Sequence, residues 1–283
     1  MENSLAALII GSEKISTLPP VYSRLMEVMS DHRSSVTDIS AIISQDAGMS
    51  VRLLRIVNSA FFGFPRKIDT VSRAVQIVGV EQVRDLVLAT SVMNSFETVP
   101  DNIVTMESFW MHSVGCGVAA RVIASFCKES NIERFFVAGI LHDIGRLIIY
   151  DRLPEKTMEI MNYAEQTGEL MYRAERAILG FDHAAVGSAL INTWRLPPSL
   201  EEIIADHHKP TVANLYRRDT TIVHFADVIT HAMKLGNSGE LHVPNINEDA
   251  WKYLELSLDV LPQLFDTVDK QANDIFRKFL SEK

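Results

Sequence analysis

The chain has 283 residues, of which 47% are hydrophobic and 22% charged, with a formal net charge of −9 and a pI near 5.5. This composition is ordinary for a globular protein with a sizeable core, and the acidic balance argues against a broad electrostatic surface for nucleic acid or anionic membranes. The N-terminal apolar run is shorter than a signal peptide requires, no stretch approaches the roughly 20 apolar residues that span a bilayer, and Cys116 and Cys127 are expected to be reduced. We therefore predict a cytoplasmic protein.

A helical period of apolar residues runs through the first hundred residues, and strand patterns are almost absent. Prolines, side chains that cap helix N-termini and one glycine indicate where the predicted helices begin and end. The expected helix starts are Pro20, Thr37 or Asp38, Asp46, Thr70 and Glu81, and Gly79 is expected to end the helix that Thr70 caps.

The segment PDNIV at 100–104 is the predicted break before a second helical region. Turn-forming residues at 236–245 predict a loop, and Pro262 divides the C-terminal apolar pattern into two amphipathic helices. Helices are expected at 105–128, 131–150, 154–168, 170–179, 183–194, 199–207, 219–235, 247–257 and 262–281. We predict an all-α fold of two packed helical lobes, residues 1–100 and 101–235, with residues 236–283 as a helical extension packed on the second lobe.

Ionisable side chains interrupt the apolar stretches of the second region, as in FFVAGILHDIGRLIIY at 135–150. Such groups are costly to bury unless they are paired, hydrogen-bonded or bound to a metal. Imidazole and carboxylate are the side chains that first-row metals and hard divalent cations accept. The candidate metal ligands are His112, His142, Asp143, His183, His207, His208 and Asp227.

Neighbouring residues on a helix point about 100° apart, which limits how adjacent candidates could share an ion. His142 and Asp143 can meet one ion only at a helix end or kink, and Gly145 is interpreted as a local weakness in the helix. His207 and His208 suit two metals, or one ligand with a supporting group, better than one ion.

A single histidine in an apolar helix is more often a hydrogen-bonded core residue than a ligand. We apply this interpretation to His32, His224, His231 and His242. Asp182 is predicted to cap the helix that starts at His183.

The order of His112, then His142 with Asp143, then Asp227 resembles the H…HD…D pattern of the HD superfamily of metal-dependent phosphohydrolases, and HDIGRL looks like its signature. His183 and the His207 and His208 doublet resemble the extra ligands of the HD-GYP branch. Members of that branch hydrolyse cyclic di-GMP at a centre of two or three metals.

A longer series of phrases, from about Leu18 to Pro210, resembles the HDOD domain, a signalling relative of these phosphohydrolases. The phrases are LPPVYSRLMEVM, ISAIISQDAGMSVRLLRIVNSAFFG, AVQIVGVEQVRDLVL, VAGILHDIGRL, GFDHAAVGSALINTWRLPPSL and ADHHKP. This resemblance implies a helical N-terminal lobe packed on an HD-like lobe. It also implies a regulatory role in bacterial signalling, with catalytic activity generally undemonstrated.

Three departures weaken the resemblance to the cyclic di-GMP hydrolases. The glutamate that they usually carry four residues before the first histidine is Ser108 here, with Glu107 adjacent but rotated away, and the lysine after HDIG is Arg146. No GYP segment follows HHKP. Arg146 could clamp a phosphate with two hydrogen bonds, although a surface charge or a helix-end contact is its commoner role.

Two functions follow from these patterns. As an enzyme, the chain would hold one divalent metal (iron, manganese, magnesium, nickel or zinc) at His112, His142, Asp143 and Asp227 and a second at His183, His207 and His208, bridged by Asp143. It would then act as a phosphohydrolase on a nucleotide or a cyclic dinucleotide, with Asp143 and Arg146 as catalytic residues.

The leading expectation is instead a regulatory module that acts on signalling proteins in trans, with metal or nucleotide held structurally. Phe61, Phe62 and Phe64 crowd beside Arg66 and Lys67 and cannot all point inward, which predicts an exposed patch for a partner. Direct nucleic-acid binding through Arg52, Arg55, Arg217 and Arg218 ranks low in so acidic a chain. The sequence allows a dimer without requiring one.

Overall fold

The computed structural model describes Leu5, Leu8 and residues 17–96 and 103–280, and every regular element among these residues is a helix. The predicted all-α class is therefore confirmed. Within the described part of the chain, no helix combines the length and the apolar content needed to cross a lipid bilayer.

Five helices make up the N-terminal part of the described chain. Asp46 and Thr70 cap the helices they were predicted to cap, each accepting a hydrogen bond from the backbone three residues on, at 2.9 Å and 3.2 Å. The predicted cap of the second helix was wrong, because Ser35 caps it and Asp38 bonds back to the Ser35 backbone as its capping-box partner. The helices are α3 (Pro20–Ser30), α4 (Val36–Ser44), α5 (Ala47–Val57), α6 (Val71–Val78) and α7 (Val80–Ser95).

The remaining helices follow from Met106 onward. The segment predicted as one helix at 131–150 is two, because the chain breaks at the histidine and aspartate in its middle. Residues 233–247 connect two helices without a helix of their own, so the predicted loop at 236–245 is confirmed. The elements are α8 (Met106–Phe126), α9 (Glu133–Leu141), α10 (Ile144–Arg152), α11 (Pro154–Thr167), α12 (Met171–Leu179), α13 (His183–Thr193), α14 (Pro198–Asp206), α15 (Arg217–Ala232), α16 (Glu248–Leu254), the short 3-10 helix η1 (Leu258–Val260) and α17 (Leu261–Leu280).

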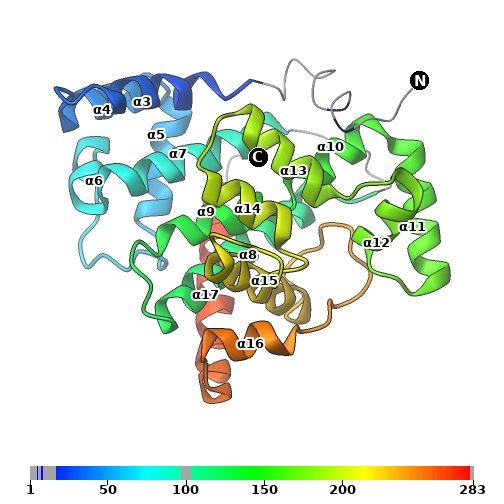
Figure 1. The fold of residues 1–283 in the computed structure, drawn as a ribbon. Coiled ribbons are helices and arrows are strands. Elements are labelled where there is room, and N and C mark those ends of the chain that lie inside the picture. The colour runs from blue at the N-terminus through cyan, green and yellow to red at the C-terminus, as the bar shows by residue number, and fades with distance from the viewer. Residues whose placement is uncertain (1–4, 6–7, 9–16, 97–102, 281–283) are drawn as a thin grey trace.

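The centre of the molecule is α8, against which α9, α15 and α17 pack. In Figure 1, α3 to α7 (blue to cyan) gather on one side and α11 and α12 (green) on the opposite side, with α8 and α15 between them. One hydrophobic core spans the N-terminal and central helices, and the rings of Phe61 and Phe136 meet across it with centroids 4.6 Å apart. The helices that pack on α8 bury every residue from Trp110 to Ala120 except Met111. Polar residues on this helix therefore lie deep in the protein.

The C-terminal helix α17 contacts both α8 and α5. Pro262 lies in its first turn, where a missing backbone N–H is tolerated, and the separation from α16 comes earlier, at Glu255. Asp274 on α17 accepts a hydrogen bond from the backbone of Ala60 at 2.7 Å, which ties the end of the chain to the segment after α5. The predicted boundary at 100–104 lies partly outside the described residues, and the division into domains stays a prediction.

Candidate metal centre

The backbone turns at the HD dipeptide. Helix α9 ends at Leu141 and α10 begins at Ile144, so His142 and Asp143 lie at a junction of two helices, as their sharing of one site requires. The Asp143 backbone, at φ −98° and ψ 9°, leaves the helical region there. The two side chains consequently face the same point, with Nε2 of His142 3.4 Å from Oδ2 of Asp143.

Gly145 is not the helix weakness that the sequence suggested. It lies inside α10, and a Cβ at this position would lie 2.7 Å from the backbone nitrogen of Gly187 and overlap the carbonyl oxygen of His183. Glycine therefore allows α10 and α13 to pack at backbone distance, which brings His183 against Asp143.

A first cluster joins α8, the α9–α10 junction and α15. Nε2 of His112 lies 3.2 Å from Oδ1 of Asp227 and 3.7 Å from Oδ2 of Asp143. Nε2 of His142 lies 3.5 Å from the same Asp227 oxygen and 3.4 Å from the same Asp143 oxygen. Two imidazoles and two carboxylates thus direct four donor atoms to one point.

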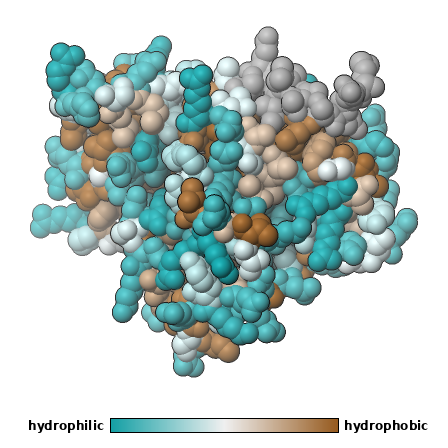
Figure 2. All heavy atoms as spheres, in the orientation of Figure 1, coloured by the Kyte–Doolittle hydropathy of each residue, from teal (hydrophilic) through white to brown (hydrophobic). Residues whose placement is uncertain are grey.

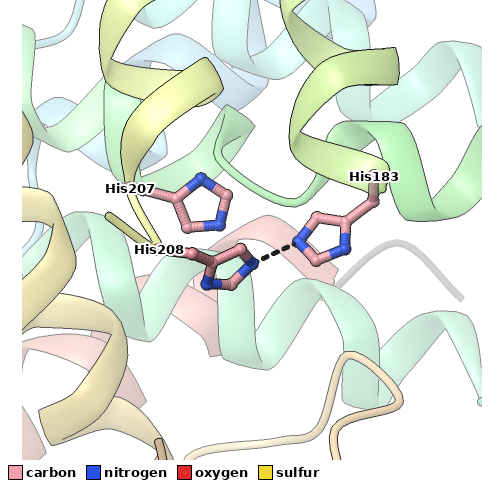
Figure 3. Close-up of side chains that lie close together, drawn as sticks. All are labelled: His183, His207 and His208. Atoms are coloured by element: carbon pink, nitrogen blue, oxygen red, sulfur yellow. Dashed lines mark hydrogen bonds between the residues drawn. The ribbon is translucent and has the colours of Figure 1, made fainter. Parts of the chain in front are cut away.

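A second cluster contains His183 at the start of α13 and His207 and His208 just after α14 (Figure 3). Their candidate ligand atoms lie within 4.8 Å of one another, and the Nε2 atoms of His183 and His208 are 2.8 Å apart. Because α14 ends at Asp206, the two adjacent histidines do not diverge as they would on a continuing helix. Oδ1 of Asp143 lies 3.0 Å from Nε2 of His183, so this carboxylate connects the clusters.

Neighbouring acceptors decide which ring nitrogen of three histidines faces the centre. Each Nδ1–H donates to an oxygen on the far side of its ring: His142 to the carbonyl of Gly139 at 2.7 Å, His207 to the carbonyl of Ile204 at 2.8 Å, and His183 to the carboxylate of Glu175 at 2.6 Å. Nε2 is therefore the atom presented to the cluster in all three. This arrangement is typical of histidines that bind metals.

Burial of the centre is nearly complete. The side chains of His112, His142, His183 and His207 have an exposed fraction of 0%, and that of Asp227 is 4%. Several donor atoms here are buried without a hydrogen-bond partner among the described residues. They are Nε2 of His112, Nε2 of His142, Oδ2 of Asp143, Nε2 of His207 and Oδ1 of Asp227. Unpaired polar atoms of this kind are costly, and a divalent cation in each of the two clusters would satisfy them.

Burial and neighbouring charges set the protonation of the cluster. Burial lowers the pKa of His112 to about 4, and burial together with nearby imidazoles lowers that of His207 to about 3. Burial favours the neutral acid at Asp143, yet the guanidinium of Arg146 and the surrounding imidazoles hold the pKa of this carboxyl well below its ordinary value. At two other histidines nearby carboxylates outweigh burial and raise the pKa, that of His142 well above its ordinary value and that of His183 to about 9. These two imidazoles would therefore have to release a proton when a metal cation binds beside the anionic carboxylate.

Arg146 is not the surface charge that was one of its two expected roles, but it does make a helix-end contact, because it lies in the first turn of α10 and bonds to the N-cap residue Asp143. Its exposed fraction is 1%, its Nε donates to Oδ1 of Asp143 at 3.1 Å, and its Nη2 lies 3.7 Å from the carboxylate of Glu240. Nη1 is buried without a hydrogen-bond partner among the described residues. Arg146 is therefore a buried cation bonded to Asp143, and the N–H groups of its Nη1 could still donate to a ligand.

Sequence reasoning missed three residues of this region. Nε2 of His231 lies 3.2 Å from Oδ1 of Asp227, although we interpreted this histidine as an ordinary core residue. The i, i+4 spacing of the two residues on α15 could have revealed it. Glu175 and Glu240 are buried carboxylates on other elements, and no local pattern pointed to them. The interpretation of His224 agrees with the structure, because its Nδ1 donates to the backbone carbonyl of His207 at 2.8 Å.

The aromatic side chains that follow α5 are only partly buried. Phe61 is buried, while Phe62 and Phe64 are half-buried and stack on each other with ring centroids 5.8 Å apart. The arginines considered for nucleic acid have partners within the chain: Arg218 pairs with Glu129, and Arg217 lies over the ring of Tyr253. In Figure 2 the visible face is mainly hydrophilic, with small hydrophobic areas scattered over it.

Comparison with known proteins identifies the family of the chain. The HDOD domain profile matches residues 15–210, which is more than half of the chain. The chain belongs to the HDOD domain family. A Treponema pallidum (strain Nichols) protein of uncharacterized function is 25% identical over 229 residues, which cover 79% of this chain and 44% of the relative. This HDOD chain therefore spans less than half the length of that relative.

Solved structures share the fold. An HDOD domain protein of unknown function from Geobacter sulfurreducens superimposes with a TM-score of 0.80 at 22% identity, over 98% of this chain and 97% of that one. A protein from Shewanella amazonensis SB2B, described as a candidate phosphohydrolase, superimposes with a TM-score of 0.76 at 24% identity, over 97% and 98% of the two chains. At these identities the likeness extends to the fold.

Proposed function

We propose that this HDOD protein is a regulatory module of bacterial signalling that holds a divalent metal in its HD-like region and acts on signalling proteins in trans. One observation carries the proposal. Donor atoms of His112, His142, Asp143 and Asp227 converge without hydrogen-bond partners among the described residues, yet their side chains are almost completely buried. The donor set suits a cation, and the burial suits a resident ion better than a substrate that must enter and leave.

The residues fit a metal in number and in chemistry. The first cluster offers two imidazoles and two carboxylates, and the second offers three imidazoles, a mixture that iron, manganese, nickel and zinc accept. A bound ion would act as a Lewis acid and lower the pKa of a coordinated water toward neutrality. In this centre Glu175 orients His183, and Arg146 keeps Asp143 ionised beside the imidazoles.

The 236–245 loop supports a closed, regulatory centre. The buried carboxylate of Glu240 accepts a hydrogen bond from the backbone of Met171 at 3.0 Å and faces Arg146. The hydroxyl of Tyr150 donates to the carbonyl of Ser238 at 2.8 Å, and Ser238 is itself buried. An anionic ligand that approached the guanidinium of Arg146 from the side of Glu240 would have to displace this loop.

The predicted partner surface is the aromatic segment with Phe62, Phe64, Arg66 and Lys67. The two half-buried rings stack beside two exposed basic side chains. This combination of apolar and cationic groups suits an acidic protein partner. The proposed organisation is a lobe of residues 1–100 that carries this surface, an HD-like lobe of residues 101–235 that carries the metal, and a C-terminal extension.

A second candidate function is a metal-dependent phosphohydrolase that acts on a nucleotide or a cyclic dinucleotide. The spare donors of Arg146 next to Asp143 favour it, because a guanidinium can bind a phosphate with two hydrogen bonds. In this case Asp143 would bridge two ions, and Arg146 would hold the phosphate.

Metal content tests the proposal first. Protein purified without a tag and without oxygen is measured by inductively coupled plasma mass spectrometry beside a His142→Ala/Asp143→Ala variant. We expect one or two metal ions per chain in the wild type and their loss in the variant. If both proteins lack metal, the proposed centre is wrong.

Turnover then separates the two functions. Metal-replete wild type is incubated with nucleotides and cyclic dinucleotides, and Asp143→Ala serves as the inactive control. The regulatory function predicts bound metal without turnover. Hydrolysis that Asp143→Ala abolishes would favour the enzyme instead.

A further inference from the structure

The metal centre has a fifth donor that the HD pattern does not include. His231 lies one helical turn after Asp227 on α15, and both side chains face α8. Its Nε2 is 3.2 Å from Oδ1 of Asp227, and its ring centroid is 4.3 Å from that of His112. The candidate ligand atoms of these three residues lie within 4.8 Å of one another.

Oδ1 of Asp227 lies close to the Nε2 atoms of three histidines. It lies 3.2 Å from Nε2 of His112, 3.5 Å from Nε2 of His142 and 3.2 Å from Nε2 of His231. It is buried and has no assigned hydrogen-bond partner among the described residues. A buried carboxylate oxygen among three imidazole nitrogens is costly, and a cation bound by these atoms together would satisfy it.

The two shortest spacings at Asp227 match those of adjacent ligands on one ion. For donors held at about 2.1 Å, adjacent ligands are roughly 3.0 Å apart in an octahedron and roughly 3.4 Å apart in a tetrahedron. The separations of 3.2 Å between His231 and Asp227 and between His112 and Asp227 fall in this range.

We propose that His231 is a ligand of the same ion as His112 and Asp227, which gives that ion five protein donors: three imidazoles and two carboxylates. The inference rests on the metal centre of the proposed function. Four donors suit tetrahedral zinc, whereas five donors leave one open position of an octahedron and so favour iron, manganese or nickel. His231 therefore biases the centre toward an octahedral metal.

The alternative role of His231 is structural, as a hydrogen-bond donor that positions Asp227. Two substitutions separate the roles. Glutamine can place an N–H near the position of Nε2 and keep the hydrogen bond, but it is a poor ligand for these ions. Phenylalanine keeps the ring contact with His112 and removes both nitrogens.

The test is the affinity of the chain for Mn²⁺, measured by calorimetric titration after chelation, together with metal content after purification. The variants are His231→Gln and His231→Phe, with His242→Gln at an exposed loop position as the control for losing an imidazole. Circular dichroism verifies that each variant folds, and the glutamine variant decides if the phenylalanine variant does not.

We expect Mn²⁺ binding by His231→Gln to weaken by at least about 10–100-fold, because even residues that only support metal ligands change affinity by this factor. The His242→Gln control should bind as the wild type does. Wild-type affinity in His231→Gln would overturn the ligand role and leave the proposed centre intact. Absence of Mn²⁺ binding in the wild type would overturn both.

Discussion

Replacing Gly145 with alanine should disrupt the metal centre without removing any of its ligands. The added Cβ would lie 2.7 Å from the backbone nitrogen of Gly187 and overlap the carbonyl oxygen of His183. Both obstacles are backbone atoms of α13, so no side-chain rotation relieves the contact. Helix α10 must move away from α13, and the separation of Asp143 and His183, now 3.0 Å between Oδ1 and Nε2, must increase.

The expected loss of stability follows from two opposing contributions. Overpacking in a close-packed interior costs about 1–3 kcal/mol and sometimes more, and the backbone contact places this site at the upper end. Alanine regains about 1 kcal/mol of helix propensity over glycine. The net loss of about 2 kcal/mol corresponds to a melting temperature lower by about 4–8 °C for a protein of this size class.

Thermal unfolding followed by circular dichroism measures this effect, and metal content measures the shift of the ligands. Gly48→Ala in α5 is the matched control, because the nearest atoms to its added Cβ, at 3.1 Å and 3.3 Å, belong to the flexible end of the Arg52 side chain. We expect the control to melt at or above the wild-type temperature and to retain metal. If Gly145→Ala melts with the control and keeps its metal, close packing of α10 on α13 does not hold the centre together.

Two further predictions concern buried groups beside the centre, and a third concerns the half-buried thiol of Cys127 at the C-terminal end of α8. Glu175→Gln should weaken metal binding about 10–100-fold in a Mn²⁺ titration, because the carboxylate that orients His183 at 2.6 Å is lost; unchanged affinity would contradict this role. Arg146→Met should destabilise the metal-free protein by about 3–5 kcal/mol in urea unfolding, because Asp143 loses its buried cation, and a change below 1 kcal/mol would show that the pair is dispensable. Burial raises the pKa of the Cys127 thiol to about 11, so a thiolate-specific reagent at pH 8 should modify it about 100-fold more slowly than a free thiol; reaction at the free-thiol rate would refute this.

Local chemistry made much of the fold predictable. Asp46, Thr70 and Asp182 cap the helices assigned to them, because capping depends on a side chain and a backbone group three residues apart. The failure at Ser35 has the same basis. Ser35 and Asp38 form a capping box that was readable in the sequence, and the prediction chose residues inside the helix instead.

Tertiary contacts made other features unpredictable. The helical period gives no sign of the break at His142, because apolar residues continue on both sides of it. Only the requirement that His142 and Asp143 share an ion indicated a helix end or kink there. Arg146 looked like a surface charge because Glu240, which faces it, is distant in the sequence, although its other partner, Asp143, is only three residues away. Gly145 looked like a weakness because only the approach of α13 shows why a side chain is excluded there.

Access to the centre, more than the identity of its ligands, separates the two candidate functions. A cation needs only donor atoms, and these converge at Oδ1 of Asp227 and at both oxygens of Asp143. A phosphodiester also needs a path to Arg146, and Glu240 faces that guanidinium while its carboxylate is held by the backbone of Met171. Entry of an anion from the side of Glu240 would therefore displace the 236–245 loop and disturb the start of α12. Movement of the 236–245 loop on binding is compatible with the proposed regulatory function. Rapid turnover would require the same movement in every catalytic cycle.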